Sequence, residues 1–177
     1  RDREARRAYG FDEIALVPGA VTVNPEEVDT TLRLGPVKLD IPFLASAMDG
    51  VVDVEFAVAM GKLGGLGVLN LDGISTRYDK PREVVSRIAG ASPEEATRLV
   101  QEMYRPPVNE DRIAERIKQI KAAGVPCAIS TIPQNADKYG RIAAEAGADI
   151  FVVQSTVTTV RHKATKYTPF DITKFCK

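Results

Sequence analysis

The chain has 177 residues, of which 44% are apolar and 27% are charged, so its length suits one domain with its own core. Lys plus Arg equals Asp plus Glu at 24 each, which excludes a strong electrostatic footprint for nucleic acid or an anionic membrane. No apolar run is long enough for a membrane helix, and no signal-peptide pattern opens the chain. Cys127 and Cys176 form no CxxC pair, so we expect a cytoplasmic protein with reduced thiols and no structural zinc.

Residues 1–41 are expected to form an N-terminal arm followed by a hairpin. The basic opening "RDREARR" is interrupted by acids, which is typical of a solvated tail. The stretches "FDEIALVPG" and "VDTTLRLGPVKLDIP" favour short strands or extended arms, with turns at Pro18-Gly19 and Gly35-Pro36.

A β-α-β pattern follows the arm. Residues 42–45 form a short strand, and "VVDVEFAVAMGKLGG" has an apolar helical face that the paired glycines end. The run "LGVLNL" then has a strand's length. This alternation predicts a parallel sheet.

Residues 71–109 interrupt this rhythm, and we expect one or two helices there, closed by Pro106-Pro107. Ser92 as N-cap, Pro93 at the first helical position and Glu95 three residues after Ser92 predict a capping box.

The α/β alternation resumes after the insert. "NEDRIAERIKQIKAAG" predicts a helix that Gly124 ends, "VPCAIS" a strand, and "QNADKYGRIAAEAG" a helix that Gly147 ends. "ADIFVVQS" is typical of a strand buried on both faces, and "TPFDITKFCK" of the opening of one more helix. The four strands are therefore expected near Phe43, Val68, Ala128 and Phe151.

Polar or small residues follow each predicted strand. Because the C-terminal ends of parallel strands share one face, where ligands bind, these residues predict a site for a neutral polar ligand. The residues are Ser46, Met48, Asp49 and Gly50; Asn70, Asp72 and Gly73; Ser130 and Thr131; and Gln154, Ser155 and Thr156. The alternative for single residues is helix capping, for example by Asp49 or Asp53.

Other motifs do not predict chemistry here. "GKLGGLG" precedes a strand, whereas a dinucleotide fingerprint follows one and opens a helix. His162 is the only histidine and lies in "VRHKATKY", which favours a solvated surface loop. Cys127 is expected to be a small core residue, and Cys176 ends a helical pattern, so neither is expected to be an activated thiolate.

The stretches "YGFDEIALVPG", "VDTTLRL", "IPFLASAMDGVVD" and "FAVAMGKLGGLGVLN" resemble the IMP dehydrogenase / GMP reductase family. The shared features are an F/Y-D-[DE]-[IV]-x-L-V-P opening, an S-A-M-D turn after the first strand and a following G-G-[IL]-G strand. "AGADIFVVQSTVTT" resembles the segment that leads into the family's dinucleotide-side loop. The resemblance covers nearly the whole chain. It implies an α/β fold, a TIM (β/α)8 barrel of which this chain supplies about the first four βα units.

The resemblance also implies roles for the strand-end residues. Ser46 would help to seat a purine nucleotide, Met48 would lie against the purine face, and Asn70 would contact the same substrate. Gln154, Ser155 and Thr156 match the nicotinamide-side contacts, which are often Asp-Ser-Ser in the family. The implied ligands are IMP, XMP or GMP, with NAD or NADP(H), and a monovalent cation such as K⁺ at a site outside this chain.

Two departures from the family pattern shape the expectation. The regulatory CBS pair is absent, and the short insert at residues 71–109 is like that of GMP reductases and of a compact IMP dehydrogenase-related branch. The family's G-x-G-x-x-C-T-type loop is also absent, so no catalytic residue is assigned, and residues 1–177 are expected to be the N-terminal half of a longer, homotetrameric enzyme. The expected activity is purine-nucleotide oxidoreduction, in either the IMP dehydrogenase or the GMP reductase direction. The alternative is a non-catalytic half barrel that serves as an interaction or regulatory module.

Overall fold

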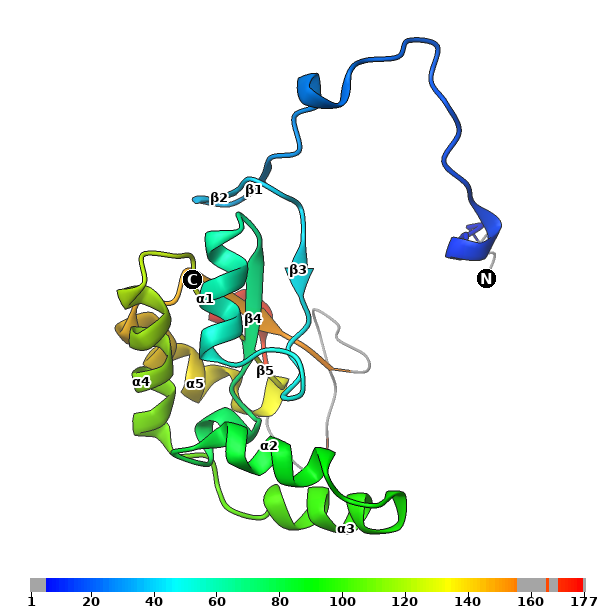
Figure 1. The fold of residues 1–177 in the computed structure, drawn as a ribbon. Coiled ribbons are helices and arrows are strands. Elements are labelled where there is room, and N and C mark those ends of the chain that lie inside the picture. Colours follow the sequence, from blue (N-terminus) through cyan, green and yellow to red (C-terminus); the bar gives the residue numbers. More distant parts are fainter. Residues whose placement is uncertain (1–5, 156–164, 166–168, 177) are drawn as a thin grey trace.

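A parallel four-stranded sheet forms the centre of the structure, a computed structural model that describes residues 6–155, Thr165 and residues 169–176 (Figure 1). Its strands run in chain order: β3 (Leu44–Ala45), β4 (Leu66–Asn70), β5 (Ala128–Thr131) and β6 (Ile150–Val153). All three neighbouring pairs are parallel, with Leu44 opposite Leu66, Val68 opposite Ala128 and Ala128 opposite Ile150. The predicted parallel α/β arrangement is therefore confirmed.

Helices cover one face of this sheet and form its main core. These helices are α1 (Val54–Lys62), α4 (Glu110–Ala122) and α5 (Pro133–Ala146). From α4, the side chains of Ile113, Ile117 and Ile120 are fully buried, and they pack with Leu69 and Ile129 of the strands. The period of these isoleucines matches a helix with one apolar stripe, which explains why α4 lies flat on the sheet.

The opposite face of the sheet is covered in part by an antiparallel hairpin. Its strands are β1 (Leu32–Leu34) and β2 (Val37–Leu39), joined at Gly35, whose φ of 57° is in the left-handed region that favours glycine. Val37 and Leu39 are buried against Leu66, Val68 and Ala128. The hairpin thus closes the end of this face where β4 begins and leaves the C-terminal end of the strands uncovered by it.

Residues 71–109 contain a short 3₁₀ turn, η3 (Ile74–Thr76), and two helices, α2 (Pro81–Ala89) and α3 (Pro93–Met103). Ile74, Val84 and Met103 form a small apolar cluster of their own that joins the turn to both helices. Figure 1 shows α2 and α3 side by side beyond the C-terminal end of β4. The insert is therefore a satellite layer at the end of the sheet where ligands bind in parallel α/β folds.

Several local expectations differ in detail from the structure. Ser92 is the N-cap of α3, but its hydroxyl meets the Glu95 carboxylate at 3.3 Å and makes no hydrogen bond to the helix backbone, so the predicted capping box is wrong. The helix expected from Gln134 already begins at Pro133, a residue well suited to a first turn. Gly147 ends that helix as expected, with a φ of 90°.

The N-terminal arm extends away from the sheet (Figure 1). It contains two short turns, η1 (Phe11–Glu13) and η2 (Pro25–Glu27), and its apolar side chains lie in solvent, with Phe11 95% exposed. At the other end of the chain, α6 (Ile172–Phe175) is one helical turn. None of the described helices is long and apolar enough to cross a membrane.

Candidate functional site

The four strand ends that were expected to form a site lie along one edge of the sheet. Asn70 and Ser130 are direct partners in the parallel register, and the backbone N–H of Gln154 donates to the carbonyl of Thr131 at 3.0 Å. Ser46 follows β3, which runs parallel to β4. Ser46, Asn70, Ser130 and Gln154 therefore share the C-terminal edge, as a parallel sheet requires.

Side-chain alternation places these residues on the face that the helices do not cover. Along β4, Leu66 and Val68 pack in the hairpin-side cluster whereas Leu69 packs under the helices, so Asn70 has the direction of Val68. By the same alternation Ser130 follows Ala128, and its hydroxyl is buried with no hydrogen-bond partner among the described residues. In a closed barrel this face is the interior, which opens at the C-terminal edge.

In the loop after β3, the Met48 side chain is exposed to solvent and its backbone is fixed by hydrogen bonds. The Met48 carbonyl accepts hydrogen bonds from the N–H groups of Val51 and Val52, both at 2.9 Å. Val52 is buried in the main core and anchors the far end of the loop. Met48 itself is 54% exposed, and Ser46 is also exposed. This loop therefore presents one hydroxyl and one thioether at the rim.

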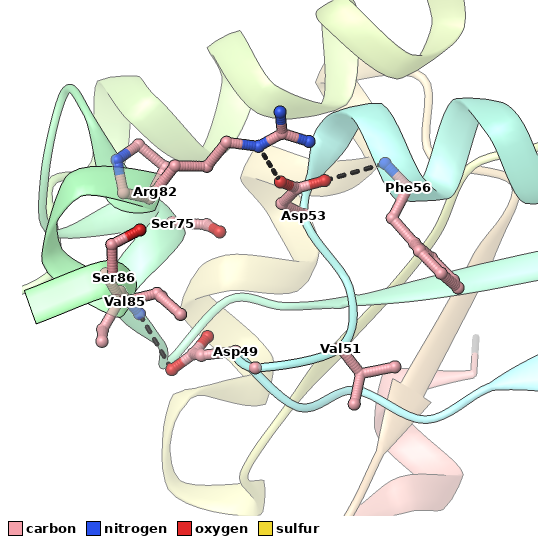
Figure 2. A pocket seen from close by; sticks show the side chains of 11 residues that line it. Asp49, Val51, Asp53, Phe56, Ser75, Arg82, Val85 and Ser86 are labelled. Carbon is pink, nitrogen blue, oxygen red and sulfur yellow. Dashed lines mark hydrogen bonds and ion pairs between the residues drawn. The ribbon is translucent and has the colours of Figure 1, made fainter. Parts of the chain in front are cut away.

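Asp53 closes this loop as the N-cap of α1, which was one of the two capping alternatives. Its carboxylate accepts from the Phe56 N–H at 2.8 Å and pairs with Arg82 of α2 (Figure 2). Burial by itself would raise the pKa of Asp53, but the hydrogen bonds from Arg82 and Phe56 outweigh it and lower that pKa below its usual value. Asp53 is thus a structural carboxylate and stays ionised.

A second strand-end acid, Asp72, connects the ends of β4 and β5. Its carboxylate accepts from Thr131 Oγ1 at 2.7 Å, from the Ile132 N–H at 2.9 Å and from Asn135 Nδ2 at 2.6 Å. Its own N–H donates to Asn70 Oδ1 at 3.0 Å. Asp72 therefore fixes the loop after β4 to the start of α5, and it leaves the Asn70 amide nitrogen without a partner in the described part of the chain.

The third acid, Asp49, connects the loop after β3 to the insert. Its Oδ2 accepts from the Ile74 N–H at 3.0 Å and from the Tyr104 hydroxyl, which follows α3. A Cβ on Gly73 would lie 1.9 Å from Asp49 Oδ1, so only glycine fits beside this carboxylate. Burial, together with the Asp49 carboxylate, raises the pKa of Tyr104 and keeps its hydroxyl a donor.

A pocket of about 310 Å³ lies between this loop, η3 and α2 (Figure 2). Asp49, Asp53, Phe56 and Arg82 line it, whereas Ser46, Met48 and Asn70 do not. Arg82 is already neutralised by Asp53 and by Glu55. The pocket is therefore on the outer side of the loop, separate from the strand-end residues that the sequence predicted as a site.

The expected cofactor-side residues follow β6. Gln154 and Ser155 are exposed, whereas Thr156 and His162 lie outside the described residues. Neither cysteine is placed to act as a nucleophile at this edge: Cys176 follows α6, and Cys127 is buried before β5. Burial raises the pKa of Cys127 to about 12, and the nearby Asp149 carboxylate adds to the shift, so its thiol stays protonated.

Sequence reasoning missed two arginines whose side chains bind backbone carbonyl groups of the insert and fix it to the rest of the fold. Arg116 of α4 is buried and donates to the carbonyls of Ser75, Tyr78 and Asp79 at 2.9–3.1 Å. Arg77 donates to the carbonyl of Asp72 at 3.0 Å and also to that of Pro106. A charged residue within the helical pattern of α4 carries no sequence signal for such contacts, because its partners are 37–41 residues away.

Comparison with known proteins agrees with this geometry. The family model of the IMP dehydrogenase / GMP reductase domain matches residues 8–168. A crystal structure of an IMP dehydrogenase/GMP reductase-like protein from Corynebacterium glutamicum superposes on this chain with a TM-score of 0.83 at 36% sequence identity. The superposed region covers 91% of this chain and 44% of the Corynebacterium glutamicum chain. This likeness confirms the predicted fold class, a TIM barrel of which this chain supplies a part.

Sequence relatives give the same result. An uncharacterized oxidoreductase of Mycobacterium bovis is 35% identical over 98% of this chain and 48% of its own length. An inosine-5'-monophosphate dehydrogenase of Methanocaldococcus jannaschii is 46% identical over 67 residues, which are 38% of this chain and 14% of that protein. The chain thus spans about half the length of relatives that match it from end to end, such as the Mycobacterium bovis protein. The chain belongs to the IMP dehydrogenase / GMP reductase domain family.

Proposed function

We propose that this chain forms the N-terminal half of the catalytic barrel of a purine-nucleotide oxidoreductase. The observation that carries the proposal is the shared C-terminal edge, where Ser46, Met48 and Asn70 come from two neighbouring strands. Their hydroxyl, thioether and amide groups are uncharged, which suits a flat, neutral, hydrogen-bonding ring such as a purine base. Family membership supports the same reading.

In this proposal the purine nucleotide is IMP, XMP or GMP. The polarisable thioether of Met48 lies against the purine face, Ser46 helps to seat the nucleotide, and the Asn70 amide donates a hydrogen bond to it. The constrained loop backbone at Met48 favours binding, because little freedom is lost when the nucleotide arrives. The loop after β3 is therefore a preformed half of the nucleotide site.

A nicotinamide cofactor, NAD or NADP(H), would accept or supply the hydride at purine C2. Gln154, Ser155 and Thr156 follow β6 and are the residues proposed to hold it. The exposed amide of Gln154 and hydroxyl of Ser155 fit the hydrogen-bonding needs of a carboxamide. An acid often occupies the position of Gln154 in the family, so the contact here would be made by a neutral group.

An activity assay of the full-length protein tests the proposal. Nicotinamide absorbance is followed with IMP plus NAD for the dehydrogenase direction, and with GMP plus NADPH for the reductase direction. Turnover with either pair is expected. Residues 1–177 alone are expected to be inactive, because neither Cys127 nor Cys176 lies at the proposed site and the described residues show no loop that would bind the phosphate.

Absence of turnover with both pairs, in a protein that is folded by circular dichroism, would contradict the proposed activity. Turnover by residues 1–177 that Cys127→Ser or Cys176→Ser abolishes would instead make one of these thiols the nucleophile.

A further inference from the structure

The insert at residues 71–109 contacts the loop after β3 through two carboxylates, Asp53 at the end of the loop, which pairs with Arg82, and Asp49 in its middle. Asp49 follows Met48 directly, and its Oδ2 accepts both the Ile74 N–H at 3.0 Å and the Tyr104 hydroxyl. Figure 2 shows Asp49 turned toward the insert, on the side of Val85 and Ser86. Two segments of the insert, 30 residues apart, thus hold the residue next to Met48.

The insert side of this contact is anchored independently of Asp49. The Arg77 guanidinium lies over the Tyr104 ring at 5.5 Å and donates to the Pro106 carbonyl. The Tyr78 hydroxyl donates to the Met103 carbonyl at 3.1 Å, and the Met103 side chain is buried. Because the end of α3 is held on both sides of Tyr104, this tyrosine can fix Asp49 in place.

The loop side is held by hydrogen bonds within the loop and by its buried end. Val52 anchors the loop in the core, and the Met48 carbonyl accepts two N–H groups from within the loop itself. In addition to the Asp53–Arg82 pair at the end of the loop, Asp49 connects the loop, between Met48 and Val52, to the insert by its side chain. Loss of this connection frees the loop locally without exposing a core side chain.

We propose that Tyr104 and Asp49 are positioning residues through which the insert sets the position of Met48 and Ser46 for nucleotide binding. This inference rests on the proposed function, since it explains how Met48 and Ser46 of the proposed nucleotide site are held in place. Tyr104 and Asp49 act through the loop backbone and do not touch the substrate. The insert thereby contributes to substrate affinity from outside the site.

The test compares Tyr104→Phe with Tyr139→Phe in the full-length protein. Tyr139, on α5, has a hydroxyl with no hydrogen-bond partner in the described structure, so it is a matched control for loss of a phenol group. Tyr104→Phe is expected to raise the nucleotide Kd and KM about five- to tenfold, as for loss of one hydrogen bond to a charged group near the surface. The kcat and the cofactor KM stay as in the wild type, and Tyr139→Phe leaves nucleotide affinity unchanged.

Gly73→Ala is a second, independent variant. Its Cβ would displace the Asp49 carboxylate while both hydrogen-bond donors remain, and the φ of Gly73, −94°, is ordinary for alanine. The same selective loss of nucleotide affinity is expected. Unchanged nucleotide Kd in both variants, or a parallel loss of kcat and melting temperature, overturns the inference.

A ligand-free readout separates this inference from the proposed function. The ¹³C-methyl NMR signal of Met48, assigned with Met48→Leu, is expected to shift in Tyr104→Phe and not in Tyr139→Phe. A shift in a protein that binds no purine nucleotide would reject the proposed function and still support positioning of the loop by the insert. An unmoved Met48 signal would reject the positioning role, even if the wild-type protein binds nucleotide.

Discussion

Removal of the Asp72 carboxylate should measurably destabilise the C-terminal edge of the sheet. Asp72→Ala deletes the acceptor for Thr131 Oγ1, the Ile132 N–H and Asn135 Nδ2. Thr131 is fully buried, so its hydroxyl would lose its partner without gaining water, at a cost of about 1–3 kcal/mol. Ile132 is exposed and Asn135 is half-buried, so water can replace much of their share. We expect a total loss of about 3 kcal/mol in the free energy of unfolding.

Asp72→Asn should cost less, about 1 kcal/mol, because the asparagine keeps one acceptor oxygen. Its new NH₂ group can be accommodated if the Asn135 amide rotates to present its oxygen instead of its nitrogen. The free energy of unfolding should therefore rise from the alanine variant to the asparagine variant to the wild type, because the number of hydrogen bonds that residue 72 can accept rises in the same order.

Urea denaturation followed by far-UV circular dichroism measures these losses. Asp79→Ala is the control, because the Asp79 side chain is 81% exposed and its ion pair with Arg112 should contribute less than about 1 kcal/mol. Equal losses for Asp72→Ala and Asp79→Ala would refute the reasoning, and so would an asparagine variant as unstable as the alanine variant.

Four further outcomes are expected. Ile117→Ala should lower the free energy of unfolding by about 2–5 kcal/mol in urea denaturation, because Ile117 is fully buried under the sheet. Iodoacetamide at neutral pH should alkylate exposed Cys176 and spare Cys127, whose pKa of about 12 keeps it protonated; peptide mass spectrometry would detect the reverse. The lowered pKa of Asp53 stabilises the folded protein at pH values above 3.8, the ordinary pKa of the group, and this stabilisation is lost as the pH falls through the lowered pKa. Asp53→Asn should therefore reduce the difference in unfolding free energy between neutral and acidic pH, measured by denaturation at several pH values. Met48→Ala should weaken IMP or GMP binding by about 1–2 kcal/mol in calorimetry, through lost contact area, with an unchanged melting temperature.

The sheet and its main helices were predictable because their signals are local. The isoleucine stripe of α4 and the glycine at 147 follow from helix period and backbone freedom, which are properties of neighbouring residues. The common edge of Ser46, Asn70, Ser130 and Gln154 follows from strand direction alone. The failed capping box shows the limit of such signals: Ser92 takes the N-cap position, but its hydroxyl bonds the Glu95 side chain.

Contacts between distant segments were not predictable, because nothing local distinguishes the partners. Tyr104 and Asp49 are 55 residues apart, and Thr131 and Asp72 are 59 apart. In sequence, Asp49 and Asp72 are equivalent strand-end acids that could cap a helix or bind a ligand. Only the packing of the insert and of α5 against the edge decides that both hold loops together.

The use of these acids also bears on the chemistry of the edge. Asp49, Asp53 and Asp72 each accept hydrogen bonds from backbone or side-chain donors of the fold, and Asp49 Oδ1 is buried with no hydrogen-bond partner among the described residues. Among the described residues, the groups at the ends of β3 and β4 include the hydroxyl of Ser46, the thioether of Met48 and the amide nitrogen of Asn70, which are all uncharged. An uncharged set of groups such as this one favours a neutral aromatic ring that stacks and accepts hydrogen bonds. The residues that fix the loops thus also set the polarity of the surface where the proposed purine ring lies.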